Sequence, residues 1–279
     1  MRRHPLMRLT GSERGGASGS SQRLVPLLLL CLASLALIAC ASAGTTSSGG
    51  TTSTGGVHTY TTNFPLTENP ISEGGNWTNG GTVGLDWGNV STTAGTAEGV
   101  GPANTAYSDP TAALTGVWGP NQTVTVTVYS NGVEDKPNQG YDKEVEIRLR
   151  TTISAHSITG YEINCRTPSD SFSYIQIVRW NGALGDFTSL NILNGTGCNN
   201  GDVLKATITG GTIQAYRNGT LMLTATDNNP FTTGNPGMGF NFGCGTAYNQ
   251  FGLTNYSATD GPTSSAAPAA PTNLTDQVK

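Results

Sequence analysis

The chain has 279 residues and a formal net charge of −4, and only 11% of its residues are charged. This balance excludes the extended basic surface with which nucleic-acid-binding proteins neutralise phosphates. Glycine is abundant, with 38 residues, and no long helical periodicity occurs after residue 40. The composition therefore favours short strands and turns over helices.

The N-terminal segment, residues 1–39, has the organisation of an export signal. Five arginines precede the apolar run LVPLLLLCLASLALIA at residues 24–39. This run is shorter than the roughly 20 residues that a membrane-spanning helix needs, but it suits a secretory signal. It closes in LIAC, which resembles the lipobox of bacterial lipoproteins. The resemblance implies a lipid on Cys40 and a place in the bacterial cell envelope, and an ordinary signal peptide is the alternative.

Two low-complexity segments flank a central region. Residues 40–57 are nearly all Ser, Thr, Gly and Ala, a composition that buries little apolar area and predicts a flexible tether. Residues 261–279 form a Pro/Ala-rich tail, for which we expect disorder. One domain is therefore expected over residues 58–260.

The central region consists of short apolar or alternating stretches separated by Gly, Asn and Asp. The dipeptide Asn218-Gly219 between two of them is a strong signal for a two-residue hairpin. Many such strands without intervening helices predict an all-β fold, a two-sheet antiparallel sandwich. The predicted strands are 122–129, 144–152, 160–166, 173–180, 203–208, 212–217, 220–226, 237–242 and 251–259.

A family resemblance covers about 100 residues of the C-terminal half. The stretch GDVLKATITGGTIQAYRNGTLMLTATD at 201–227, followed by GNPGMGF and FGLTNYSATD, resembles the concanavalin A-like jelly rolls of the laminin-G, lectin and glucanase group. The resemblance implies a jelly roll with a carbohydrate or protein ligand in the groove of its concave sheet. Because this fold also hosts glycoside hydrolases and polysaccharide lyases, the resemblance does not choose among these functions.

The stretch DKEVEIRLR at residues 142–150 alternates charged and apolar side chains. The period of two predicts that its aliphatic residues face the core and that its charges, through Arg150, face solvent. In the next two strands the face opposite the aliphatic residues carries amide and aromatic groups. Planar polar groups beside rings on a rigid sheet favour a polysaccharide or glycoconjugate as the partner. The candidate ligand-binding residues are Glu146, Arg148, Glu162, Asn164, Tyr174, Gln176 and Trp180.

Within this set Tyr174 and Trp180 are expected to be ring platforms for the sugar. A platform in an open groove is not part of the core. The interpretation therefore predicts that replacing Trp180 with Ala leaves stability nearly unchanged.

Two enzyme interpretations compete with binding. Asp142, Glu144 and Glu146 resemble the Glu-x-Asp-x-Glu motif of laminarinase-type glycosidases, but with Asp and Glu exchanged. EIRLR at 146–150, Gln176-Ile177-Val178 and Tyr248-Asn249-Gln250 follow the order of alginate-lyase motifs. Val178, however, replaces the histidine of that family, and valine transfers no proton. These departures favour a lectin-like binding module without catalytic residues over a hydrolase or lyase, and a non-sugar adhesive or structural domain is the third alternative.

Three cysteines follow the lipobox. Cys198 and Cys244 lie in Gly-rich segments that could meet, so we expect a disulfide between them and a buried thiol at Cys165. No cofactor is expected, although calcium is possible because the family that the chain resembles often holds it in Asp/Asn loops. The candidate calcium ligands are Asp202, Asp227 and Asp260.

Overall fold

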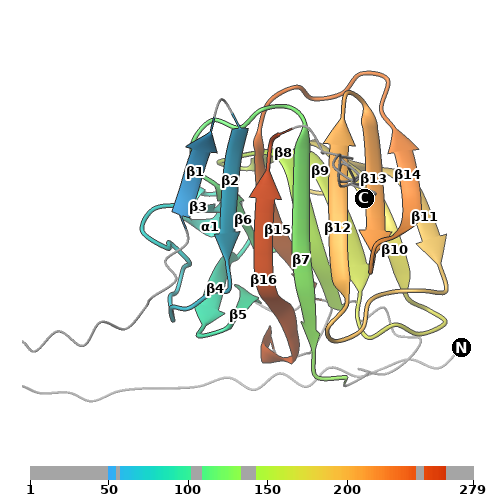
Figure 1. Cartoon of the computed structure of the whole chain (residues 1–279), viewed down its shortest axis with the longest axis horizontal. Helices are drawn as coiled ribbons and strands as arrows, with labels where there is room; N and C mark the ends of the chain where they lie inside the picture. The colour runs from blue at the N-terminus through green and yellow to red at the C-terminus, as the bar shows by residue number, and fades with distance from the viewer. Residues whose placement is uncertain (1–49, 55–56, 102–108, 133–142, 243–247, 262–279) are drawn as a thin grey trace, which may run out of the picture. The chain divides into compact units, whose positions relative to one another are not determined.

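Two antiparallel sheets pack face to face in the computed structural model, which describes residues 50–54, 57–101, 109–132, 143–242 and 248–261 (Figure 1). These residues belong to one compact unit, Thr45–Lys279. The predicted all-β, two-sheet antiparallel jelly-roll sandwich is confirmed. No helix of the described residues is long and apolar enough to cross a membrane.

The first sheet has nine strands. Seven of them form a continuous path, and two short strands pair with each other and meet the path at β16. In spatial order the path is β1 (Gly50–Thr54), β2 (Val57–Thr62), β16 (Phe251–Thr259), β7 (Gln122–Ser130), β12 (Val203–Thr209), β13 (Thr212–Arg217) and β14 (Thr220–Thr226). The two short strands are β4 (Asn89–Thr93) and β5 (Thr96–Val100).

The second sheet has seven strands and carries the candidate site. Its spatial order is β11 (Phe187–Asn194), β10 (Tyr174–Ala183), β9 (Ser157–Arg166), β8 (Lys143–Ser154), β15 (Asn235–Phe242), β6 (Thr111–Leu114) and β3 (Trp77–Asn79). We call the side of this sheet that points away from the nine-stranded sheet the outer face. A short helix, α1 (Gly80–Val83), and a 3-10 turn, η1 (Tyr248–Gln250), complete the elements.

The nine strands predicted from the sequence all form, with boundaries shifted by no more than a few residues. Asn218 and Gly219 adopt φ values of 51° and 80°, as the tight turn between β13 and β14 requires. The sequence analysis missed β11, whose side chains are mostly exposed, and the short strands of the N-terminal half. It also assigned residues 50–54 to the tether, whereas they pair with β2 as strand β1.

Alternation along the strands builds the core between the sheets. In β7 the valines at 124, 126 and 128 are buried, while the threonines between them are partly exposed. Val145, Ile147 and Leu149 of β8 are fully buried on the facing sheet, as predicted. Each fully buried aliphatic side chain contributes roughly 1.5–3 kcal/mol to folding, so these two strands alone supply a substantial share of the hydrophobic stabilisation.

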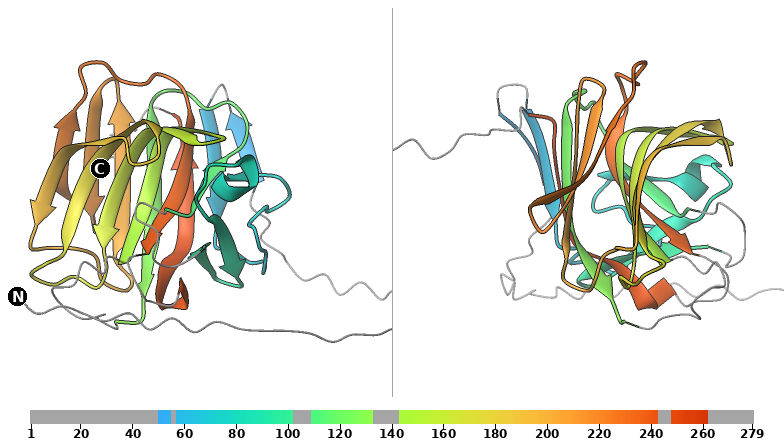
Figure 2. Two further views of the ribbon diagram at one scale, coloured as in Figure 1. Left: turned by 180° about the vertical axis from the view of Figure 1, so that it is seen from behind. Right: turned by 90° about the vertical axis from the view of Figure 1, so that its right-hand side faces the viewer.

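The charged side of β8 is not solvated, which corrects the sequence interpretation. Glu144, Glu146 and Arg148 are at most 3% exposed. The segment that contains α1 covers part of the outer face (Figure 2). Its side chains build a second apolar cluster against the sheet, which we call the outer cluster. The outer cluster consists of Leu85, Trp87, Ile158, Val178 and Trp180.

Arg150 does not continue the charged face, contrary to the sequence prediction. The pairing of β8 with β9 shifts register between Leu149 and Thr152, and Arg150 has a φ of 48°. The bulge redirects its side chain. The guanidinium donates instead to the carbonyl oxygens of Pro120 and Phe231, both at 2.5 Å.

The predicted disulfide between Cys198 and Cys244 is wrong. Cys165 and Cys198 form a disulfide, with their Cα atoms 5.8 Å apart. Cys165 therefore is not a free thiol, and Cys244 lies outside the described residues. The partner was not readable from the sequence, because the pairing of three cysteines is not determined by their spacing. The backbone N–H of Cys198 donates to the carbonyl of Arg166, and this contact sets the cysteine beside the end of β9.

Candidate functional site

A pocket of about 170 Å³ opens on the outer face of the seven-stranded sheet. Its walls come mainly from β9 and β10, whose register sets Asn164 beside Gln176 and Glu162 beside Val178. These residues alternate with core residues along their strands, so their side chains share the outer face. The lining residues are Asp109, Glu144, Glu162, Asn164, Tyr174, Gln176, Val178, Trp180, Phe187 and Asn241.

The structure brings together most of the residues that the sequence singled out. Five of the seven predicted ligand-binding residues line the pocket, namely Glu162, Asn164, Tyr174, Gln176 and Trp180. The other two, Glu146 and Arg148, are fully buried and are not among the lining residues. They therefore support the pocket electrostatically and are not positioned to touch a ligand.

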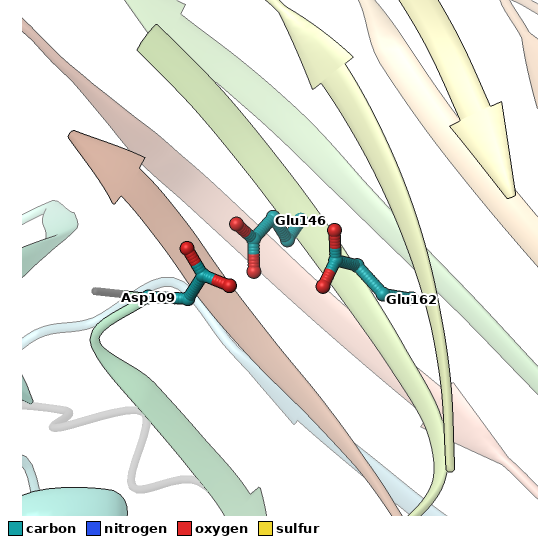
Figure 3. Close-up of side chains that lie close together, drawn as sticks. All are labelled: Asp109, Glu146 and Glu162. Atoms are coloured by element: carbon teal, nitrogen blue, oxygen red, sulfur yellow. The ribbon is translucent and has the colours of Figure 1, made fainter. Parts of the chain in front are cut away.

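Arg148 is the centre of what we call the buried charge cluster, which consists of Asp109, Glu146, Arg148 and Glu162. The Arg148 guanidinium pairs with Glu146, lies 2.5 Å from Glu162 Oε2 and lies 3.7 Å from Asp109 Oδ2. The three carboxyl groups converge, with oxygens within 4.8 Å of one another (Figure 3). One guanidinium thus faces three acidic groups.

The pKa values of two carboxyl groups in the cluster lie above their usual values. Burial first, and then repulsion from Glu162, raises the pKa of Asp109 to about 7, although the Arg148 charge opposes the shift. Burial raises the pKa of Glu146 well above its usual value, again against the attraction of Arg148. For Arg148 itself, burial favours the neutral form, but the surrounding carboxylates outweigh it and the pKa rises. Arg148 therefore stays charged. Its single positive charge does not compensate all three carboxyl groups, so they do not all ionise readily.

Two tryptophans seal the buried charge cluster, and one of them is Trp180. The Trp87 and Trp180 rings meet edge to face, with centroids 4.9 Å apart. The Arg148 guanidinium lies 5.4 Å from the centroid of Trp87, within cation–π range. Trp180 is only 3% exposed and its indole N–H donates to Glu162 Oε2 at 2.5 Å. Trp180 is therefore a buried wall of the pocket, and its predicted role as an exposed platform is corrected.

Hydrogen bonds inside the pocket wall engage most of its donors. Asn164 Nδ2 donates to Glu162 Oε1 at 2.9 Å, and Gln176 Nε2 donates to Ser189 Oγ at 2.7 Å. The Tyr174 hydroxyl donates to Glu144. Two buried oxygens of lining residues lack a hydrogen-bond partner: Asp109 Oδ1 and Asn164 Oδ1.

Five lining residues were not among the predicted ligand-binding residues: Asp109, Glu144, Val178, Phe187 and Asn241. Two of them, Glu144 and Val178, were considered only in the enzyme motifs. Phe187 is 36% exposed and its ring lies 5.2 Å from that of Trp180, directly opposite it in the pairing of β10 with β11. The exposed edge strand shows no clear apolar alternation, so β11 and its aromatic residue escaped notice. Asp109 precedes β6, and no local pattern links it to β9.

The structure brings the residues of the enzyme motifs to the pocket only in part. Glu144 lines the pocket, but Glu146 is paired with Arg148 and does not, and Asp142 lies outside the described residues. Val178 lines the pocket and belongs to the outer cluster, and valine transfers no proton. Tyr248, in η1, is not among the lining residues.

The three aspartates considered for calcium contact protein groups and belong to no shared acidic cluster among the described residues. Asp202 accepts a hydrogen bond from Asn218, and Asp227 accepts one from Tyr161 and pairs with Arg179.

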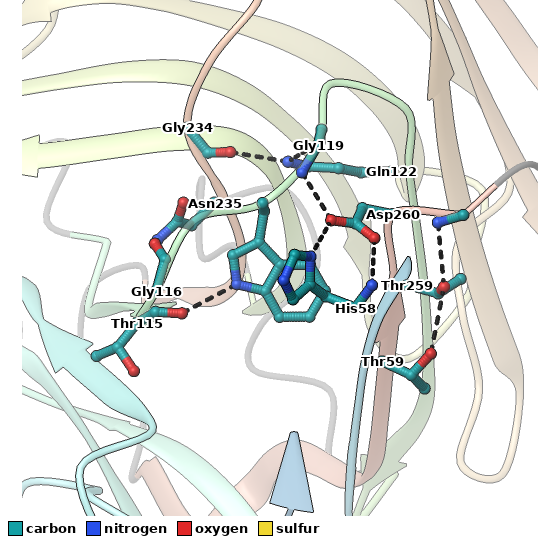
Figure 4. Close-up of polar contacts among 12 residues, drawn as sticks. His58, Thr59, Thr115, Gly116, Gly119, Gln122, Gly234, Asn235, Thr259 and Asp260 are labelled. Atoms are coloured by element: carbon teal, nitrogen blue, oxygen red, sulfur yellow. Dashed lines mark hydrogen bonds and ion pairs between the residues drawn. The ribbon is translucent and has the colours of Figure 1, made fainter. Parts of the chain in front are cut away.

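The third aspartate, Asp260, accepts hydrogen bonds from the backbone N–H of Gly119 and from His58, through both the backbone N–H and the ring Nδ1 of His58 (Figure 4). These bonds outweigh the effect of burial and lower the pKa of Asp260. Asp260 thus joins the end of β16 to β2 and to the segment before β7.

Two other hollows in the described surface are larger but carry no charged side chain. One, of about 350 Å³, lies on β2, β7 and β16 and is lined mainly by threonines and asparagines. The other, of about 420 Å³, lies along β6, β8 and β15 and is lined by threonines, glycines and small apolar residues. Neither combines carboxylates, amides and an exposed ring, so the pocket on β9 and β10 remains the candidate site.

No protein-family model matches the chain, and no curated protein matches it either. Among solved structures, the carbohydrate-binding module CBM66 from Bacillus subtilis is similar, with a TM-score of 0.42 and 14% identity over 66% of this chain and 92% of that chain. The potassium-bound carbohydrate recognition domain of Emp46p is similar with a TM-score of 0.49 and 12% identity, over 72% and 96% of the two chains. A native glycosidic hydrolase is similar with a TM-score of 0.42 and 12% identity, over 72% and 94%. These similarities identify no ligand of this chain.

Proposed function

We propose that the pocket on β9 and β10 binds a carbohydrate and that the domain is a lectin-like binding module. The observation that carries the proposal is the lining itself. Carboxylate and amide groups of Glu162, Asn164 and Gln176 stand on rigid strands beside the rings of Tyr174 and Phe187. Because the strands hold these groups in place, little conformational entropy is lost on binding. The volume is below the roughly 300–1,000 Å³ of pockets that enclose drug-sized ligands, which suits one sugar unit.

A glycoside hydrolase is the second candidate. The carboxyl oxygens of Asp109 and Glu162 lie within 4.8 Å of each other, and retaining glycosidases hold their two carboxyl groups about 5–5.5 Å apart. Against this, Glu162 accepts hydrogen bonds on both oxygens, from Arg148, Trp180 and Asn164. A carboxylate held in this way is a weak nucleophile, and binding is the better-supported function.

Glycan-array screening and titration calorimetry with the full chain test the proposal. We expect dissociation constants between about 1 mM and 1 µM, because a small pocket with one exposed ring supports weak binding. Phe187→Ala and Tyr174→Phe are expected to weaken binding at least about tenfold, or about 1.4 kcal/mol. The control is Leu221→Ala, which removes a 47%-exposed side chain of the other sheet.

Three results would contradict the proposal. The first is that no glycan is retained. The second is that Leu221→Ala weakens binding as much as Phe187→Ala does. The third is that prolonged incubation with a glycan releases new reducing ends. The last of these would instead support the hydrolase, provided that Glu162→Gln abolishes the release.

We further propose that the protein is exported and anchored to a membrane by a lipid on Cys40. The support is the basic segment, the apolar run, its LIAC ending and the Ser/Thr/Gly-rich sequence that follows Cys40. Mass spectrometry of the membrane fraction is expected to find diacylglycerol on Cys40. Cys40→Ala is expected to move the protein to the soluble fraction or to stop its processing, whereas the control Cys31→Ala leaves it anchored. Equal membrane association of the Cys40→Ala protein would refute the anchor.

A further inference from the structure

The charges around the pocket are unbalanced towards acid. Three lining residues are carboxylic acids, and the described lining includes no lysine, arginine or histidine. Arg148 lies behind the wall, fully buried and engaged by Glu146 and Glu162. The pocket therefore presents negative charge to a ligand and should repel an anionic sugar.

The hydrogen-bonding groups show the same preference. The donors of Trp180, Asn164, Tyr174 and Gln176 already bond to protein oxygens. Among the fully buried side-chain atoms of the lining residues, the two that lack a hydrogen-bond partner, Asp109 Oδ1 and Asn164 Oδ1, are both acceptors. Both residues are more than nine-tenths buried. A buried acceptor without a donor costs roughly 1–3 kcal/mol. A ligand that supplies donors would remove this cost.

We infer that the sugar unit in this pocket is an amino sugar whose ammonium group bonds to Asp109 and Asn164. The inference rests on the proposed function and names its ligand class. An ammonium offers three donors and no acceptor, which matches a pocket with free acceptors and surplus negative charge. Charge-assisted bonds to a carboxylate are also stronger than neutral ones. The Arg148 guanidinium contacts the carboxyl groups from behind the pocket wall. Asp109 lines the pocket, so the ammonium approaches it from the pocket side.

Calorimetry with the full chain at pH 7.5 compares three tetrasaccharide probes: glucosamine, N-acetylglucosamine and a glucuronate-containing chain. We expect the glucosamine probe to bind at least about tenfold tighter than the acetylated one, with the glucuronate probe weakest. Asp109→Asn is expected to remove the preference for the free amine. The matched control is Asp186→Asn, which removes an exposed carboxylate outside the pocket.

The pH dependence gives a second readout on the unmodified protein. Asp109 faces Glu146 and Arg148 from β8 and Glu162 from β9, and burial raises its pKa to about 7. Between pH 7.5 and 5.5 Asp109 gains a proton, whereas the ligand amine only becomes more fully charged. The preference for the amine probe over the acetylated probe is therefore expected to decrease as the pH is lowered. Such a decrease reports protonation of Asp109, because the ligand amine only gains charge over the same range.

The outcomes separate the inference from the proposed function. Equal binding of the amine and acetylated probes, with loss of both in Phe187→Ala, overturns the amino-sugar inference and leaves carbohydrate binding intact. Competition by butylammonium as strong as by glucosamine also overturns it, because the sugar ring then contributes nothing. Failure of every glycan to bind refutes the proposed function itself. If Asp109→Asn does not fold, the probe and pH comparisons on the unmodified protein still decide.

Discussion

Replacing Arg148 with Met is expected to lower the free energy of unfolding by about 3–5 kcal/mol, because it leaves buried carboxyl groups without their cation. Arg148 is fully buried and is the one basic group within the buried charge cluster. Methionine keeps much of the side-chain volume beneath Trp87, so the loss reports the missing charge rather than a cavity. Urea denaturation at pH 7, monitored by tryptophan fluorescence, measures this loss in the free energy of unfolding.

The loss is expected to depend on pH with a definite sign. Without the guanidinium, the pKa values of Asp109 and Glu146 in the folded protein rise further above their ordinary values. A carboxyl group with a raised folded-state pKa favours folding below its unfolded pKa, near 4, and this contribution disappears as pH rises through the folded pKa. The deficit of Arg148→Met should therefore be smaller at pH 5 than at pH 8.

Arg166→Met is the matched control. Arg166 is only partly buried and stands on the neighbouring strand, and exposed ion pairs contribute about 0–1 kcal/mol. A loss at Arg148 no larger than at Arg166, or a deficit that grows towards acid pH, would show that the buried charge cluster does not stabilise the fold in this way.

Replacing Trp180 with Ala is expected to cost about 3–5 kcal/mol, as large-to-small changes of buried aromatic residues do. The ring is 3% exposed, packs edge to face on Trp87 and covers Arg148 within 6.0 Å of its centroid. The change would also remove the indole donor from Glu162. Thermal and urea denaturation are expected to show the loss whether or not a glycan is present.

Two further variants separate the contribution of the Trp180 ring packing from that of its hydrogen bond to Glu162. Trp180→Phe keeps most of the ring but not the N–H, and it is expected to cost about 1–3 kcal/mol, the range for a buried acceptor that loses its donor. Phe187→Ala, at the half-exposed ring in contact with Trp180, is expected to cost about 1 kcal/mol. If Trp180→Ala left the stability unchanged, Trp180 would be the exposed platform that the sequence suggests, and the outer cluster would not hold in solution.

Local patterns were sufficient for the strands that border the core. The alternation in QTVTVTVY and EVEIRLR places valine, isoleucine and leucine inward whatever the rest of the chain does, because the two faces of a strand repeat every two residues. Asn218-Gly219 likewise specifies its turn through backbone conformation alone. The same period correctly grouped Glu162, Asn164, Tyr174 and Gln176 on one face, and those four line one pocket.

What lies on top of a face is decided only by tertiary structure. The period of two places Arg148 and Trp180 opposite the core, but it carries no information about residues 80–88, which cover that face and bury both side chains. Asp109 reaches the same cluster from another part of the chain, and Cys198 reaches Cys165 across 33 residues. These contacts depend on how distant segments fold over the sheet. The sequence by itself therefore determined the sandwich and the faces of its strands, whereas burial of the charges, the disulfide and the acidic character of the pocket came from long-range packing.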